Sequence, residues 1–185
     1  SNQMFIVYII VVLCVAISMK TPAFAEVSTI ITLARALLVT LCFAICEMVV
    51  IISGGIDVSF PALASLSAYA TTKFLLDKNY EGNVLLAFVI AIAIGAVLGA
   101  VNGYFIGYLN LNAMIVTLGS ASIFQGIMQG TLRANQLSVI PSGMKSFGTA
   151  AFLTATNKTN GLTSILPYTF IILVLVCAVM HFVLH

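Results

Sequence analysis

Four long runs of almost uninterrupted apolar residues dominate this chain. They occupy residues 4–19, 36–52, 84–94 and 165–184. The strands of a membrane barrel would instead alternate apolar and polar residues. In lipid, the backbone of such continuous runs must satisfy its hydrogen bonds within helices. The runs therefore predict an all-α fold, a polytopic bundle of transmembrane helices.

The composition agrees with a membrane protein and excludes two other classes. Of 185 residues, 62% are hydrophobic and 6% are charged, whereas soluble domains carry about 25% charged residues. Seven Lys and Arg against five Asp and Glu give a formal charge of +2, which cannot supply the dense basic surface that nucleic-acid binding requires. An ordinary soluble enzyme and a nucleic-acid binder are therefore both excluded.

At roughly 20 residues a crossing, the length allows about six membrane helices. We predict them at residues 4–19, 28–52, 61–76, 83–109, 113–132 and 164–185. A polar connection of about 133–163 precedes the last helix, and residues 1–185 are predicted to form a single transmembrane domain. The third helix is the least apolar and should face protein or water, because it carries Ser65, Ser67, Tyr69, Thr71 and Thr72.

A glycine-containing break, Ser53-Gly54-Gly55-Ile56-Asp57-Val58-Ser59, separates the second and third predicted helices. Glycine-interrupted apolar segments mark broken helices in transporters, where the freed backbone groups line a cavity or are buried in protein. Asp57 or Ser59 is placed to cap the next helix. The alternative is a plain turn between two helices.

Four glycines recur at intervals of four residues in the fourth predicted helix, at Gly95, Gly99, Gly103 and Gly107. This spacing allows another helix backbone to approach closely, and a functional hinge is the alternative. Asn102 lies beside the glycines and would be costly facing lipid, so we expect it to form a hydrogen bond across a helix interface.

Five polar residues are candidates for a substrate path. Glu47 is an intramembrane carboxyl group, which is by default a functional hypothesis; it could also be a protonated or hydrogen-bonded link between helices. Ser122, Gln125 and Gln129 share one helical face and suit an uncharged polar solute such as a sugar, or ordinary bonding between helices. Asp57 completes the candidate path.

The residues offer no catalytic machinery. The chain has no nucleophile and base pair, no phosphate-binding loop and no set of residues with metal-ligand spacing. We therefore expect neither catalysis nor a metal or cofactor.

Three stretches resemble bacterial ABC permeases that import ribose, xylose, galactose, arabinose and related small solutes. The break at 53–59 is similar to the Gly-Ile-Asp-Leu-Ser signature of that family. Residues 21–24 resemble its Ser-Pro-x-Phe, and 113–126 resemble its Phe-Ile-x-Thr-Leu-Gly and Ser-Ile-x-Arg-Gly block. The chain departs from the pattern at Phe60-Pro61, where Val-Gly is common, and at Gln125, where Arg is common.

The resemblance implies the N-terminal part of a permease subunit that crosses the bacterial cytoplasmic (inner) membrane several times. It also implies three kinds of partner: a second permease subunit, cytoplasmic ATP-binding subunits that hydrolyse ATP, and a periplasmic solute-binding protein. Two other hypotheses stay open. One is an autonomous channel or proton-coupled carrier that uses Glu47, and the other is a non-transporting membrane scaffold in which the glycines serve assembly.

Overall fold

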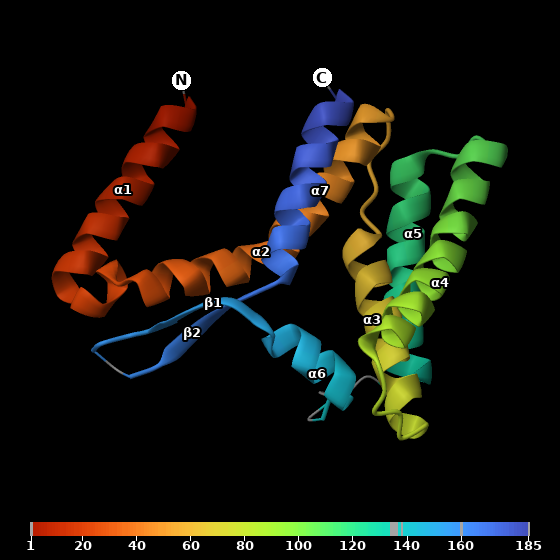
Figure 1. The fold of residues 1–185 in the computed structure, drawn as a ribbon. Helices are drawn as coiled ribbons and strands as arrows, with labels where there is room; N and C mark the ends of the chain where they lie inside the picture. Colours follow the sequence, from red (N-terminus) through yellow and green to blue (C-terminus); the bar gives the residue numbers. More distant parts are fainter. Residues whose placement is uncertain (1, 134–136, 138, 160, 185) are drawn as a thin grey trace. The chain divides into compact units, whose positions relative to one another are not determined.

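The structure, a computed structural model, describes residues 2–133, 137, 139–159 and 161–184 (Figure 1). It divides into two compact units. One unit comprises Ser1–Leu41 with Thr149–His185, and the other is Cys42–Gly148. Each unit is described by itself below, and the predicted single transmembrane domain stays a prediction.

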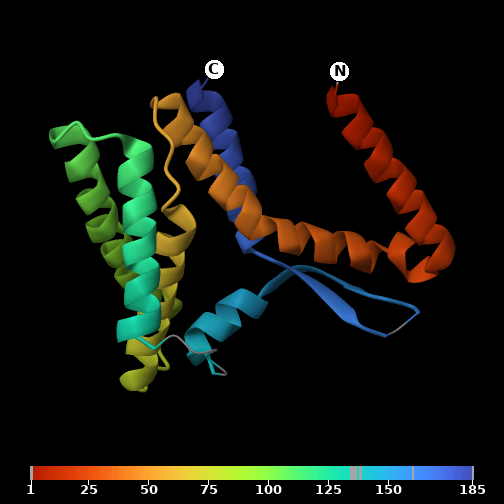
Figure 2. The ribbon, with the colours of Figure 1, turned by 180° about the vertical axis from the view of Figure 1, so that it is seen from behind.

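Helices form at the six predicted positions (Figures 1 and 2). They are α1 Asn2–Lys20, α2 Val27–Ile52, α3 Phe60–Asp77, α4 Val84–Gly103, α5 Ala113–Gly126 and α7 Thr169–Leu184. A short 3-10 helix, η1 Pro22–Ala25, precedes α2, and one-turn π-helical segments, η2 Tyr104–Tyr108 and η3 Ile127–Thr131, extend α4 and α5.

Two helical stretches in the described part of the chain are long and apolar enough to cross a membrane. They are Val27–Ile52 and the continuous stretch Val84–Tyr108. Two shorter apolar helices cover Met4–Lys20 and Thr169–Met180. The predominantly helical class is confirmed, while a bundle with six membrane spans stays a prediction.

In the unit Cys42–Gly148, α3 packs against both α4 and α5, and the three helices lie side by side in both views (Figures 1 and 2). Ala62, Leu66 and Phe124 form the buried core between α3 and α5. The hydroxyl residues Ser67 and Thr71 of α3 are also buried. The third helix therefore faces protein, as its polar composition predicts.

Asparagine caps fix the starts of α4 and α5. Asn83 Oδ1 accepts a hydrogen bond from Leu85 N at 3.0 Å. Asn112 Oδ1 accepts two, from Met114 N at 3.0 Å and Ile115 N at 3.3 Å. Both side chains satisfy amide groups that have no partner within the first turn of a helix.

Replacing Asn112 with Ala should cost about 1 kcal/mol of the free energy of unfolding, because two amide groups of α5 lose their acceptor. Thermal or denaturant unfolding in detergent micelles measures the change. Asn112→Asp is the matched control, since a carboxylate can accept the same bonds. Equal losses in the two variants would show that the cap does not stabilise α5.

The predicted polar connection contains regular structure: a short helix at the end of the unit Cys42–Gly148 and a hairpin in the other unit. After the short helix α6 Ser142–Thr149, strands β1 Ala151–Thr156 and β2 Thr163–Pro167 pair as an antiparallel hairpin. At its tip, Asn157 N donates to Leu162 O at 2.8 Å, and Gly161 adopts a φ of +71°. The last helix was therefore predicted to begin too early, because the residues from 164 onwards first pair with β1.

Glu26 ties the hairpin to the start of α2 in the same unit. Its carboxylate accepts from the Thr159 hydroxyl at 2.6 Å and from Lys158 N at 2.7 Å. The Thr159 hydroxyl bond, followed by the Lys158 amide bond, lowers the pKa of Glu26 below its ordinary value of 4.5. Nearby, the hydroxyl groups of Thr32 and Ser164 form a second link at 2.8 Å.

This attachment should weaken only in acid. Because the folded state lowers the pKa of Glu26, its stabilising contribution is complete above pH 4.5 and is lost as the pH falls through the lowered pKa. The NMR amide shift of Lys158 should titrate with a midpoint below 4.5. Glu26→Gln should abolish this titration and Glu81→Gln should preserve it; a midpoint at or above the ordinary value would contradict the prediction.

Candidate functional site

The predicted break at 53–59 begins where α2 closes its last turn. Gly54 N donates to Ile51 O at 3.0 Å and Gly55 N donates to Val50 O at 3.2 Å. Gly54 has a φ of +87°, a conformation that residues with a Cβ rarely adopt. This pair of bonds with a left-handed glycine is a Schellman motif. The glycine pair therefore ends α2 through a specific closure rather than through low helix propensity alone.

A chain of buried hydrogen bonds joins the end of this break to α4. Asn102 Nδ2 donates to Ser59 Oγ at 2.9 Å, and Ser59 Oγ donates to Asp57 Oδ1 at 2.6 Å. The same carboxylate oxygen accepts from Ser59 N at 2.7 Å. Ser59 is completely buried and Asn102 is 5% exposed. The expected bond of Asn102 across a helix interface is thus confirmed, with Ser59 at the start of α3 as its partner.

Thr117 of α5 holds the break from another side. Its Oγ1 accepts from Val58 N at 3.2 Å, and the Thr117 side chain is completely buried. The bond gives a partner to an amide that has none within a helix, so this hydroxyl stabilises the extended backbone of the break. Neighbouring helices that satisfy freed backbone groups are what a broken apolar helix requires.

The break lines a cavity of about 420 Å³ inside the unit Cys42–Gly148. Asp57 and Asn102 contribute polar groups to it. Among the described residues, no group donates to the buried Asn102 Oδ1. A carboxylate can only accept hydrogen bonds, so Asp57 favours a donor in the cavity. The remaining lining residues are Val50, Ser53, Gly55, Ile56, Phe60, Leu63, Gly95, Gly99, Gly103, Ile106 and Ala113.

Three of the four predicted packing glycines, Gly95, Gly99 and Gly103, form one wall of this cavity. A Cβ added at Gly99, Gly103 or Gly107 would have no atom of the described residues within 4 Å outside its own helix. At Gly95 it would make ordinary contacts of 3.7 Å with Leu63 and Ser67. Close approach of a second helix along the glycines stays a prediction.

The other candidate path residues lie away from this cavity. Ser122, Gln125 and Gln129 are exposed on α5 and η3, and the Ser122 hydroxyl donates to Leu118 O at 3.1 Å within its own helix. Glu47 is half-buried on α2 and is not among the residues that line the cavity. Instead of gathering the five candidates, the structure links Asp57 through Ser59 to Asn102, and Thr117 bonds the neighbouring backbone at Val58.

The role of Thr117 was not predicted. It belongs to the segment 113–119 that was matched to a sequence motif, but a threonine in an apolar helix gives no signal for which distant backbone group it binds. In the described residues, no three His, Cys, Asp or Glu side chains lie together as a group that could hold a metal ion.

Apolar helices with an interior break, and buried polar groups that satisfy it, are typical of helical transporters. Comparison with known proteins specifies the class further. The chain is 32% identical over 89 residues to the D-allose transport system permease protein AlsC of Escherichia coli (strain K12). The matched residues are 48% of this chain and 27% of AlsC.

Two further relatives are permease proteins of autoinducer 2 import systems. LsrC of Klebsiella pneumoniae is 25% identical over 146 residues, which are 79% of this chain and 42% of LsrC. LsrD of Salmonella typhimurium is 29% identical over 110 residues, which are 56% of this chain and 32% of LsrD. The resemblance to bacterial import permeases is thereby confirmed.

The matches span about a quarter to two fifths of the length of these relatives. No family model matches the chain. No solved structure matches it either.

Proposed function

We propose that this chain forms part of the permease subunit of a bacterial ABC importer and crosses the cytoplasmic membrane several times. It contributes to the translocation path for a monosaccharide or a similar small polar solute. The sequence similarity to import-system permeases supports this class. A second permease subunit, ATP-binding subunits and a periplasmic solute-binding protein complete the system, and ATP hydrolysis takes place on the ATP-binding subunits.

The observation that carries the proposal is the cavity at the helix break. Non-helical backbone at membrane depth is tolerated where it is buried in protein or lines a water-filled cavity. Here Ser59, at the end of the break, and Thr117, which bonds it, are buried. Asp57 and the neighbouring Asn102 line the cavity of about 420 Å³. A hydroxyl group of a neutral solute would donate to the Asp57 carboxylate.

The exposed residues of α5 and the Glu47 carboxyl group belong to a second part of the same proposal. Ser122, Gln125 and Gln129 are exposed on α5 and η3. We assign them to a path completed by other segments or by a second permease subunit. Their amide and hydroxyl groups can both donate and accept, which suits an uncharged solute.

Uptake of labelled monosaccharides into proteoliposomes that contain the permease, its ATP-binding subunits and the solute-binding protein tests the proposal. Asp57→Asn keeps an oxygen for the Ser59 bonds but loses the charge, so ATP-driven uptake should fall about tenfold or more. Asp77→Asn, at the last residue of α3, is the matched control and should transport normally.

Three results would argue against this function. Normal uptake with Asp57→Asn would remove Asp57 from the path. Solute flux driven by a proton gradient without ATP, and abolished by Glu47→Gln, would favour the carrier hypothesis. If the chain neither alters the activity of an ATP-binding subunit nor supports flux, the scaffold hypothesis is favoured.

A further inference from the structure

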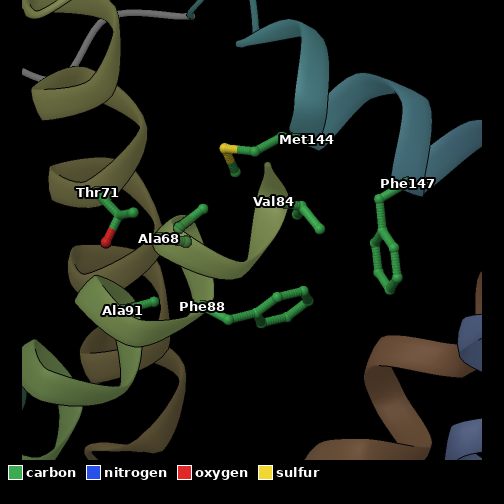
Figure 3. A pocket seen from close by; sticks show the side chains of 8 residues that line it. Ala68, Thr71, Val84, Phe88, Ala91, Met144 and Phe147 are labelled. Atoms are coloured by element: carbon green, nitrogen blue, oxygen red, sulfur yellow. The ribbon is translucent and has the colours of Figure 1, made fainter. Parts of the chain in front are cut away.

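A second cavity, of about 220 Å³, lies in the same unit between α3, the first turns of α4 and the short helix α6 (Figure 3). It shares no lining residue with the cavity at the helix break. The residues around it are Ala68, Thr71, Val84, Ala87, Phe88, Ala91, Met144 and Phe147.

Helix α6 is held over this space at its first turn. Ser142 Oγ donates to Glu81 O at 3.1 Å. The backbone at Gly143 approaches Gly82 so closely that a Cβ at Gly143 would lie 2.1 Å from the Gly82 carbonyl oxygen. Because this contact joins two backbones, the first turn of α6 cannot move inward to close the gap.

The second turn of α6 supplies one wall. Met144 and Phe147 are three residues apart and therefore lie on one helical face, whereas Lys145 is exposed. The Phe147 ring meets the Phe88 ring edge to face, with centroids 5.4 Å apart and an angle of 84°. Figure 3 shows Met144, Phe88 and Phe147 around the opening between the two helices.

The opposite walls are short apolar side chains, which is why the space stays open. Ala68, Ala87 and Ala91 reach only one carbon from the backbone of α3 and α4. Thr71 brings the single side-chain oxygen among the lining residues, and Figure 3 shows that oxygen turned away from Met144.

The space opens at the surface of the unit, because its lining residues Ala68 and Phe88 are exposed. Its walls are almost entirely apolar. Contiguous exposed apolar surface marks contact with a membrane, a ligand or another protein, so the space favours an apolar occupant over water.

The position of the cavity at the start of an apolar helix indicates which apolar molecule could occupy it. Its α4 residues form the first two turns of Val84–Tyr108, a stretch long and apolar enough to span a membrane. Immediately before it comes the charged turn with Asp77, Lys78 and Glu81. An amphipathic helix such as α6 suits the boundary between headgroups and hydrocarbon, where phospholipid acyl chains begin.

We propose that this cavity binds an acyl chain of a membrane phospholipid, clamped between Phe88 of α4 and the apolar face of α6. The proposal depends on the membrane placement in the proposed function but not on any transported solute. Its test needs no transport, so the failure of either proposal can be recognised separately.

The sequence has no Trp, so Phe147→Trp introduces a single fluorescent reporter at the cavity wall. The variant is placed in lipid nanodiscs containing phospholipids brominated along their acyl chains, and the bromine should quench the indole emission. Adding Ala91→Phe fills the cavity and should roughly halve this quenching. Ala96→Phe, at an exposed position of the same helix, is the matched control and should leave the quenching unchanged.

Native mass spectrometry of the chain with Phe147 intact gives an independent readout. Ala91→Phe should retain fewer phospholipids after detergent extraction than Ala96→Phe or the unaltered chain. Equal lipid retention and equal quenching in the two variants would overturn the proposal. Stronger quenching by aqueous iodide than by brominated chains would also overturn it, because the cavity would then hold water.

Discussion

Replacing Ser59 with Ala should lower the free energy of unfolding of the unit Cys42–Gly148 by about 1–3 kcal/mol. Ser59 is completely buried and its hydroxyl group both donates to Asp57 and accepts from Asn102. Without it, the Asn102 amide becomes a buried donor with no partner. Asn102 Oδ1 already lacks a partner in the described structure. Both polar atoms of this buried side chain would then be without a hydrogen bond in this part of the chain.

Reversible unfolding in mixed micelles measures the loss. Ser53→Ala is the matched control, because Ser53 is exposed and its hydroxyl group bonds only Val49 O of its own helix, at 2.9 Å. A surface change of this kind should stay within about 0.5 kcal/mol. Equal effects of the two substitutions would show that the buried hydrogen-bond chain does not stabilise the break.

A double-mutant cycle separates the energy of the hydrogen bond between Ser59 and Asn102 from the cost of leaving the Asn102 amide buried without a partner. Asn102→Leu removes the amide and leaves Ser59 bonded to Asp57, so it should cost less than Ser59→Ala. In the Asn102→Leu background no buried amide is orphaned, and Ser59→Ala should then cost less than it does in the unaltered chain. Simple additivity of the two losses would exclude coupling between these side chains.

The helices were predictable because the signals that set them are local. Apolar runs locate the helices along the chain, and Gly54-Gly55 and Pro61 mark the end of α2 and the start of α3. The predicted ends of α2 and α3 agree with the structure to within one residue. Lipid removes most alternatives, since a chain in hydrocarbon must bond its own backbone.

The hairpin was missed because the apolar run of the last helix is a stronger pattern than the turn that joins the two strands. Only Pro167, Tyr168 and Thr169 separate the apolar residues at 165–166 from the apolar run of α7, so 165–166 were counted with the helix. Their pairing with β1 depends on the turn at Asn157 and Gly161. That turn lies in a polar stretch with no periodic pattern, and strand pairing is a contact between segments that the local pattern does not specify.

The site was predicted only in part, because some of its hydrogen bonds are local and others join segments far apart in the sequence. Asp57 and Ser59 stand two residues apart, so a local hydrogen bond between them could be expected. Asn102 is 43 residues from Ser59 along the chain, and Thr117 is 59 residues from Val58. The sequence indicated that Asn102 needed a partner, but the identity of that partner is decided by how α3, α4 and α5 pack.

The polar face of α5 shows how a helix irregularity limits such reasoning. The spacing of Ser122, Gln125 and Gln129 assumes an α-helix throughout, and the helix becomes π-helical at Ile127. A π-helical turn changes the direction in which later side chains point. Gln129 is therefore rotated relative to the face predicted for Ser122 and Gln125, although all three remain exposed.

Replacing Gly143 with Ala should detach the first turn of α6 from the connection between α3 and α4. The new Cβ would lie 2.1 Å from the Gly82 carbonyl oxygen and 3.2 Å from Val84 N. Both neighbours are backbone atoms, so relief requires α6 to move and the Ser142 bond to Glu81 O to break. Forcing extra atoms into such a contact costs about 1–3 kcal/mol, which corresponds to roughly 5- to 150-fold more frequent opening.

Amide hydrogen exchange of residues 142–149 measures this opening. Gly148→Ala is the matched control, because a Cβ at Gly148 would meet no atom within 4 Å; alanine there should even slow exchange slightly through its higher helix propensity. Exchange in α6 should therefore rise with Gly143→Ala and not with Gly148→Ala. If both variants exchange like the unaltered chain, the backbone contact does not hold α6, and Met144 and Phe147 alone must keep the helix over the apolar cavity.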